Sequence, residues 1–141
     1  MRYSASVAPI VVRQCLRRDC QYWAAGSASV NLVFPADQLT FTGPLAKFVS
    51  QADSGNRMTR GFCATCGTPV TSASEARPEF VILRAGTLDD TSIARPSLSI
   101  WTESAPPWTH HTTPRFPRHH ASRRRCPAEP RHTLTSHARE G

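Results

Sequence analysis

The chain lacks any long apolar run. The longest apolar stretch, residues 7–12, is interrupted by Pro9 and is far too short to span a bilayer. No segment with a charged start and an apolar middle follows Met1, as a secretory leader would require. We therefore expect a cytoplasmic protein without a membrane partner.

The cysteines have an ordinary density and an odd number, which argues against a secreted disulfide framework. The 141 residues contain five cysteines, which are Cys15, Cys20, Cys63, Cys66 and Cys126. In a reducing compartment, closely spaced cysteines more often bind a metal or take part in redox chemistry. The two closely spaced pairs are therefore the candidate functional residues.

Histidine is missing from the first 108 residues, and acidic side chains are rare in the remainder. Residues 1–108 carry ten Lys and Arg against eight Asp and Glu, whereas residues 109–141 carry seven Arg against two Glu. All six histidines and four prolines lie in the second segment, with Phe116 and Leu134 as its large apolar residues. Such a segment buries too little surface to offset its ordering entropy. We predict a folded domain over residues 1–108 and a disordered basic tail over residues 109–141.

The tail has two potential partners. Its arginines could neutralise phosphates of a nucleic acid, and the pairs His110–His111 and His119–His120 could bind a metal. No aromatic residues alternate with the arginines, and the folded part is close to neutral. We therefore favour a solvated tail and expect neither a nucleic-acid partner nor a metal site there.

Residues 1–108 have the pattern of a mainly β domain. Turn residues separate the short apolar and β-branched stretches SVAPIVVR, SVNLVF, LTFTG, LAKFVS, TPVTS and EFVILRAG. One short helix is predicted over residues 19–25, with Asp19 as its N-cap and Gly26 after its end. The two aspartates of GTLDD are expected to cap a turn and to have no catalytic role.

Cys63 and Cys66 form a C-x-x-C motif followed by Gly67. This spacing lets one tight turn direct two thiolates at one ion, and the glycine permits a close approach of the backbone. The redox use of C-x-x-C needs a helix after the motif, whereas Pro69 and its β-branched neighbours predict a strand. We favour metal binding over redox chemistry or simple burial.

Cys15 and Cys20 are the other pair in the folded part, with a C-x4-C spacing that is less common in zinc sites. Two interpretations remain open from spacing alone. All four cysteines could form one structural zinc site, or Cys15 and Cys20 could be ordinary buried cysteines.

Several stretches in order resemble the glutathione-dependent formaldehyde-activating enzyme family, whose domain also occurs in centromere protein V. They are CLRRDC, GSASVNLVFPAD, LTFTG, FVSQADSGNRMTRGFCATCGTPV, VILRAGTLDD and RPSLSIWTESAPPW, within residues 2–108. The resemblance implies a zinc-containing β-tent fold. It also implies a carbon–sulfur lyase that joins formaldehyde to glutathione, or acts on an adduct such as S-hydroxymethylglutathione. The expected partner is a small glutathione-like thiol or an aldehyde.

The resemblance also implies two zinc sites and names Zn²⁺ as the cofactor. Cys63 and Cys66 would belong to a structural zinc, whose other two cysteines lie upstream of the first residue. Cys15 and Cys20 would belong to a catalytic zinc that relatives hold with three cysteines. Arg17 occupies the place of the middle cysteine, which removes a ligand and adds a positive charge. No side chain is assigned a catalytic role.

These departures leave two functions open. The chain either acts as a lyase with the surviving ligands, or is a zinc-depleted, inactive remnant of the family. Ser99, which stands where relatives often carry histidine, is a milder departure. A nucleic-acid binder acting through the tail is a third and weaker alternative.

Overall fold

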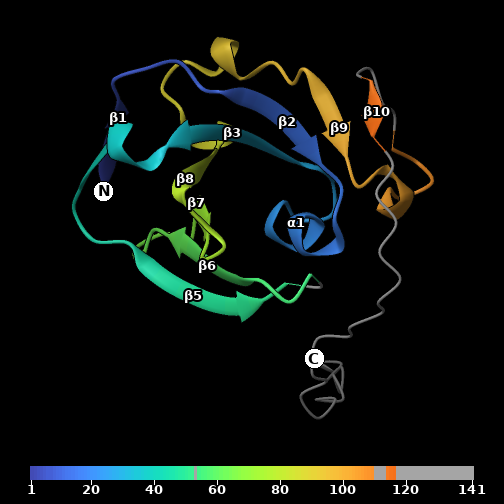
Figure 1. Cartoon of the computed structure of the whole chain (residues 1–141), viewed down its shortest axis with the longest axis horizontal. Helices are drawn as coiled ribbons and strands as arrows, with labels where there is room; N and C mark the ends of the chain where they lie inside the picture. Colours follow the sequence, from blue (N-terminus) through green and yellow to red (C-terminus); the bar gives the residue numbers. More distant parts are fainter. Residues whose placement is uncertain (53, 110–113, 117–141) are drawn as a thin grey trace, which may run out of the picture.

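A computed structural model of the chain describes residues 1–52, 54–109 and 114–116, and β strands predominate in it (Figure 1). The strands are β1 (Arg2–Ala5), β2 (Val11–Cys15), β3 (Ser29–Pro35), β4 (Leu39–Thr42), β5 (Ala46–Gln51), β6 (Arg57–Phe62), β7 (Pro69–Ser74), β8 (Arg77–Arg84), β9 (Leu98–Ile100) and β10 (Arg115–Phe116). The helix α1 (Arg18–Trp23) and the 3-10 turns η1 (Ala36–Gln38), η2 (Ala85–Thr87), η3 (Thr91–Ala94) and η4 (Thr102–Ser104) connect them. The mainly β fold predicted from the sequence is confirmed.

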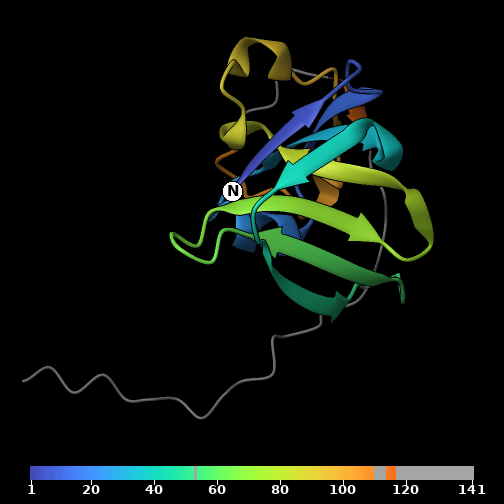
Figure 2. The same ribbon diagram turned by 90° about the vertical axis from the view of Figure 1, so that its left-hand side faces the viewer.

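Eight of the strands form one sheet in the order β10-β9-β2-β3-β8-β7-β6-β5, and β1 pairs with β4 in a small second sheet. The pairs β2–β9 and β9–β10 are parallel, while the other pairs are antiparallel. In Figure 1 the large sheet curves around α1, with β2 and β3 above the helix and β5 and β6 below it. Figure 2, turned by 90°, shows how twist fans the strands out.

The alternation of side chains along each strand gives the large sheet two different faces. Val12, Leu32, Phe34 and Leu83 form the apolar core together with Ala94. The residues that alternate with them on β2, β3 and β8 point to the opposite face, where they line a polar cavity; these are Arg13, Cys15, Asn31, Val33, Ile82 and Arg84. The central strand β3 is buried on both faces, because the core covers one and α1 lies over the other.

The helix begins one residue earlier than predicted, and Asp19 does not cap it. Arg17 occupies the N-cap position without a side-chain hydrogen bond, and Asp19 lies in the first turn. The carboxylate of Asp19 instead accepts a hydrogen bond from Arg60, because the helix packs against the sheet at this point. The predicted end is close to the observed one: Gly26, at φ +111°, donates its N–H to the Gln21 carbonyl over 2.8 Å.

Within residues 1–108, three strands were missed from the sequence: β1, β6 and β9. β6 carries two arginines and a glycine, so its apolar alternation is weak. Of the segment predicted to be disordered, the structure describes residue 109 and residues 114–116. Arg115–Phe116 pair with β9 there, which differs from the prediction, and the rest of the segment lies outside the described residues. No helix among the described residues is long and apolar enough to cross a membrane.

Candidate functional site

A cavity of about 500 Å³ opens on the polar face of the sheet. Both cysteines of the first pair line it, together with five arginines: Arg13, Arg17, Arg60, Arg77 and Arg84. None of the described residues that line this cavity is Asp or Glu. We refer to it as the arginine cavity. Its cationic wall contrasts with the nearly neutral sequence of the folded part.

The register of the sheet brings these side chains together. Arg13 pairs with Asn31, which in turn pairs with Arg84 on its other side, so all three lie in one row across β2, β3 and β8. Cys15 lies two residues beyond Arg13 on the same face, at the end of β2. Cys20 reaches the cavity from α1, across the short loop that joins strand and helix.

The thiol groups of Cys15 and Cys20 affect each other's ionisation. Cys15 is buried, with 5% of its surface exposed, whereas Cys20 is half-buried. Hydrogen bonding from the Cys15 thiol lowers the pKa of Cys20 to about 7, and the guanidinium groups of Arg84, Arg17 and Arg60 act in the same direction. The pKa of Cys15 is raised by the same hydrogen bond and by burial. The pair therefore consists of a buried thiol and a more accessible thiolate.

Arg84 is a buried cation at the centre of the cavity wall. Its guanidinium donates hydrogen bonds to the hydroxyl groups of Ser29 and Ser72, each over 2.7 Å, and to the amide oxygen of Asn31. Burial lowers the pKa of Arg84, and the charge of the neighbouring Cys20 opposes this effect. Its Nε atom is buried and has no hydrogen-bond partner among the described residues.

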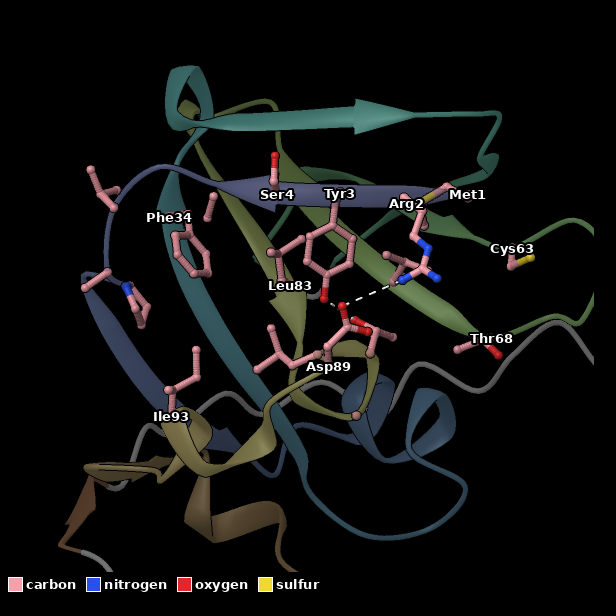
Figure 3. A pocket seen from close by; sticks show the side chains of 18 of the residues that line it. Met1, Arg2, Tyr3, Ser4, Phe34, Cys63, Thr68, Leu83, Asp89 and Ile93 are labelled. Atoms are coloured by element: carbon pink, nitrogen blue, oxygen red, sulfur yellow. Dashed lines mark hydrogen bonds and ion pairs between the residues drawn. The ribbon is translucent and has the colours of Figure 1, made fainter.

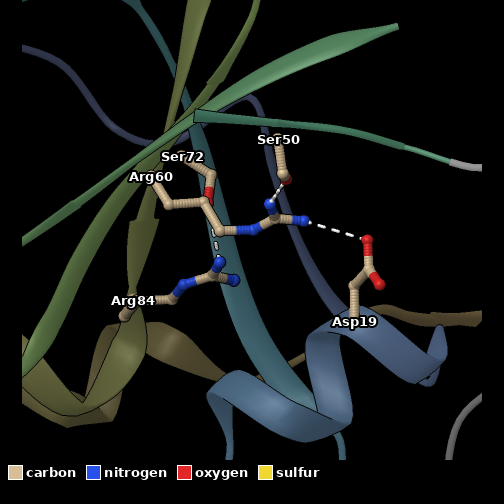
Figure 4. Close-up of polar contacts among 5 residues, drawn as sticks. All are labelled: Asp19, Ser50, Arg60, Ser72 and Arg84. Carbon is tan, nitrogen blue, oxygen red and sulfur yellow. Dashed lines mark hydrogen bonds and ion pairs between the residues drawn. The ribbon is translucent and has the colours of Figure 1, made fainter. Parts of the chain in front are cut away.

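Arg60 lies beside Arg84 and forms an ion pair with Asp19 (Figure 4). Its guanidinium lies 3.0 Å from the carboxylate of Asp19 and also donates to the Ser50 hydroxyl. Its exposed fraction is 7%, so the pair is largely removed from water on the arginine's side. Arg60 thereby ties α1 to β6 and fixes the position of the helix that carries Cys20.

Arg17 lies over an aromatic ring, and both residues line the cavity. Its guanidinium is 4.1 Å from the ring centroid of Trp101, a residue in the left-handed conformation at φ +61°. Gln21 fixes the surrounding loops, because its amide donates to the carbonyl groups of Leu16 over 2.6 Å and of Ser104 over 2.7 Å. Arg17 is therefore a positioned cation in the lining that also contains Cys15 and Cys20.

Cys63 and Cys66 lie elsewhere, on the tight turn between β6 and β7. The Gly67 N–H donates to the Cys63 carbonyl over 2.8 Å, and Gly67 has a φ of +72°, as the predicted turn requires. Backbone N–H groups of Cys66 and Thr65 point at the sulfur of Cys63 and lower its pKa to about 7. The strand β7 follows at Pro69, so the helix expected of a redox motif is absent at this point of the described chain.

This second pair lines a different cavity, of about 600 Å³ (Figure 3). Met1, Tyr3 and Leu83 also line it, so it lies on the core side of the sheet. Its charged groups are an exposed ion pair, Arg2 with Asp89 at 3.7 Å. Although this cavity is the larger one, Arg60 and Arg84, which are buried, line the arginine cavity.

The predicted turn role of GTLDD agrees with the structure at Asp90. Its carboxylate accepts the N–H of Ser92 over 2.9 Å and caps the turn η3. Ser99 is fully buried and donates to the side-chain oxygen of Gln14 over 3.2 Å.

Comparison with known families identifies the family of the chain. The family described as glutathione-dependent formaldehyde-activating enzyme matches residues 1–104 of the chain. The chain belongs to this family. A search of the curated proteins finds none that matches this chain.

The metal ligands implied by the resemblance to the formaldehyde-activating family are present as two separate pairs. Cys15 and Cys20 line the arginine cavity, and Cys63 and Cys66 line the other. No group of three or more His, Cys, Asp or Glu that could hold a metal ion occurs among the described residues. Since a protein zinc site takes at least three protein ligands, neither pair completes one by itself. Zinc binding stays a prediction.

The arginines of the cavity, Trp101 and Gln21 were missed by the sequence reasoning. Arg84 ends the strand pattern EFVILR, where it lies on the same face as Ile82, away from the apolar core, so a signal was available. Arg60 gave no such signal, because its strand was not predicted. Trp101 belongs to the motif IW that carries the family resemblance, yet its contact with Arg17 depends on the fold.

Proposed function

We propose that this chain binds glutathione and its formaldehyde adduct, S-hydroxymethylglutathione, in the arginine cavity, and acts on the carbon–sulfur bond of the adduct. Membership of the formaldehyde-activating family suggests the substrate class. The observation that carries the proposal is a cavity lined by five arginines and two thiols, with no acidic residue among its described lining residues. Glutathione carries two carboxylates, and guanidinium groups bind carboxylates in a fixed bidentate geometry.

The size and the free donors of the cavity support this assignment. A volume of about 500 Å³ lies within the range of small-molecule sites. The Nε atoms of Arg84 and Arg17 are buried without a hydrogen-bond partner among the described residues. A buried donor that lacks an acceptor costs free energy, and a bound carboxylate would supply that acceptor.

The guanidinium groups would also assist the reaction. When the adduct decomposes, its hydroxyl group loses a proton to water and becomes the carbonyl group of formaldehyde. The carbon–sulfur bond breaks, and its electron pair remains on sulfur as the glutathione thiolate. Arg84 and Arg17 already lie beside a sulfur atom, that of Cys20, and a positive charge there favours a thiolate. The reverse reaction, attack of the thiolate on formaldehyde, uses the same arrangement.

Zinc belongs to the proposal through the resemblance alone, and a cytoplasmic location through the prediction from the sequence. Zinc would find two sulfur ligands in Cys15 and Cys20 and two in Cys63 and Cys66, so each ion would need further ligands. The cytosol keeps thiols reduced and contains glutathione, which suits both the cysteines and the substrate.

A second candidate is a family member that binds glutathione without turning the adduct over. Arg17 favours it, because an arginine stands where relatives place a cysteine and its guanidinium is held on Trp101. In that case the arginine cavity keeps its binding role and the reaction is lost.

The test is the rate of exchange between glutathione, ¹³C-formaldehyde and their adduct, followed by NMR with and without the full chain. We expect the protein to accelerate exchange, and Arg84→Gln and Arg17→Gln to reduce the acceleration about tenfold or more, since a hydrogen bond to a charged group contributes ~1.5–3 kcal/mol. Arg95→Gln is the matched control, because Arg95 is exposed and lies outside the cavity. Exchange no faster than in buffer would refute the lyase and leave the binding alternative.

A further inference from the structure

The cavity of about 600 Å³ on the core side of the sheet has a mostly apolar wall (Figure 3). Phe34, Val70 and Leu83, which are buried, line it. Val7 and Ile93 line the same cavity, yet both side chains are exposed. A ligand with an apolar body would cover these exposed side chains and remove apolar surface from water.

The charged side chains of this cavity lie in water and compensate each other. Arg2 and Asp89 form an ion pair at 3.7 Å, and both are highly exposed. No other Arg, Lys, Asp or Glu occurs among the described residues that line the cavity. In Figure 3 the residue Cys63 lies on the opposite side of the view from Phe34 and Ile93. The apolar part of the cavity therefore suits a neutral ligand better than an ion.

The Tyr3 hydroxyl offers this cavity a hydrogen-bond acceptor. The Tyr3 oxygen lies 2.7 Å from the Thr87 oxygen, which lies 2.7 Å from the carbonyl oxygen of Arg84. Because a carbonyl oxygen can only accept, the Thr87 hydroxyl donates its proton to Arg84 and accepts the proton of Tyr3. Burial raises the pKa of Tyr3, so its hydroxyl carries that proton at neutral pH. The Tyr3 oxygen has thus used its donor and offers a ligand its lone pairs.

The direction of these hydrogen bonds determines which ligand group fits. Tyr3 donates to Thr87, and Thr87 donates to the Arg84 carbonyl group. A ligand hydroxyl that donates to the Tyr3 oxygen would extend this chain, in which each bond polarises the next. In Figure 3 the Tyr3 ring points away from β1, and its oxygen lies near the turn that carries Asp89.

We propose that this cavity binds a neutral alcohol or phenol, whose apolar body covers the wall and whose hydroxyl group donates to the Tyr3 oxygen. Its volume lies within the range of small-molecule sites. The site is independent of the function proposed for the arginine cavity, because the two cavities lie on opposite faces of the sheet. A ligand of similar shape without a donor would cover the Tyr3 oxygen and leave it without a hydrogen bond, which costs affinity.

The test compares the affinity of the full chain for 4-propylphenol and 4-propylanisole, by isothermal titration calorimetry at pH 7. The two compounds share their apolar body, but the methyl ether of the second cannot donate a hydrogen bond. We expect the phenol to bind about three- to tenfold more tightly, as one neutral hydrogen bond allows. Equal affinities, or no binding of either compound, would overturn the proposal.

Two variants test the role of the hydroxyl groups. Tyr3→Phe removes the acceptor and keeps the ring, so the preference for the phenol should disappear. Thr87→Val removes the acceptor of the Tyr3 proton, which is then available to an ether oxygen, so the preference should shift toward the anisole. Tyr22→Phe is the matched control, because Tyr22 is exposed and lies outside the described lining of the cavity. A preference that persists in Tyr3→Phe, or is unchanged in Thr87→Val, would contradict the assigned hydrogen bonds and overturn the proposal.

Gly86 tests the location of the ligand. It lines the cavity, and a Cβ atom at this position meets nothing within 4 Å, so a larger side chain has room there. Gly86→Phe should weaken the binding of both compounds at least about tenfold, because the ring takes up volume that the ligand needs. Glutathione in excess should displace neither compound, since the arginine cavity lies on the other face. Unchanged affinities in Gly86→Phe, or displacement by glutathione, would place the compounds elsewhere and overturn the proposal.

Discussion

At Cys20, a neighbouring thiol and three guanidinium groups surround one sulfur atom. The hydrogen bond from Cys15 is the largest influence that lowers its pKa, and burial opposes it. The result, a pKa of about 7, lies well below the ordinary value for cysteine of about 8.5. Cys20 thus changes charge near neutral pH, and its reactivity should increase as the thiolate forms.

We predict that alkylation of Cys20 by iodoacetamide in the folded chain rises with pH through a midpoint of about 7. The thiolate is the reactive form, so the rate should level off above this pH and fall below it. Cys15 should stay unmodified over the same range, because its pKa is raised. Tryptic mapping measures the two sites separately. In the chain unfolded in urea, the alkylation midpoints of both cysteines should return to about pH 8.5. A midpoint of about 8.5 for Cys20 in the folded chain would contradict the lowered pKa.

Arg17 lies at the place where the resemblance expects a metal ligand. We predict that Arg17→Cys increases the zinc retained per chain after dialysis under reducing conditions, because it adds a third sulfur beside Cys15 and Cys20 and removes a positive charge. Elemental analysis gives the zinc content. Arg95→Cys, which adds a cysteine at an exposed position outside the cavity, should leave it unchanged. Equal zinc content in the parent and Arg17→Cys would show that this position is not part of a metal site.

Among the elements, α1 depends on one buried side chain. Gln21 is 2% exposed. Its side chain joins the helix to the loop before it, through the Leu16 carbonyl, and to η4, through the Ser104 carbonyl. We predict that Gln21→Ala lowers the free energy of unfolding by ~1–3 kcal/mol, because two carbonyl groups lose their donor. Denaturant unfolding measures the change. Gln51→Ala, which removes a single exposed hydrogen bond to Gly55, should cost less than about 0.5 kcal/mol.

The contact between β6 and β7 also depends on one residue, Gly61. A Cβ atom at this position would overlap the side chain of Thr71 and lie 3.3 Å from Leu45, so a neighbour would have to move. We predict that Gly61→Ala lowers the free energy of unfolding by ~1–3 kcal/mol. At Gly86 a Cβ meets nothing within 4 Å, and Gly86→Ala should change stability by less than about 0.5 kcal/mol. A similar change in the free energy of unfolding for both variants would mean that β6 and β7 do not pack closely at Gly61 and Thr71.

The sequence predicted elements where alternation was strong and missed them where polar residues interrupted it. β3 and β8 follow from SVNLVF and EFVILRAG, because every second side chain enters the apolar core. β6 was missed, since Arg60 and Gly61 occupy its middle and Arg60 is buried on the cavity face. The N-cap of α1 was misplaced because Asp19 pairs with Arg60, a contact between distant parts of the chain that local sequence does not contain.

At the scale of the whole molecule, the residues of the apolar core and the residues of the candidate site lie on opposite faces of the large sheet. One face carries the apolar core, and the other carries cations and thiols beneath α1. The cysteine pairs could be selected from their spacing in the sequence. The grouping of arginines could not, because it depends on which residues become neighbours across β2, β3, β6 and β8. This arrangement is the basis for proposing an anionic thiol as the ligand.

The most direct test of that proposal is the affinity of the full chain for glutathione, compared with glutathione whose two carboxylates are esterified, by isothermal titration calorimetry. We predict that the free acid binds at least about tenfold more tightly, that added salt reduces the difference, and that Arg84→Gln removes most of it while Arg95→Gln does not. Equal affinities for the acid and the ester, or no binding of either, would contradict the assignment of the arginine cavity to glutathione.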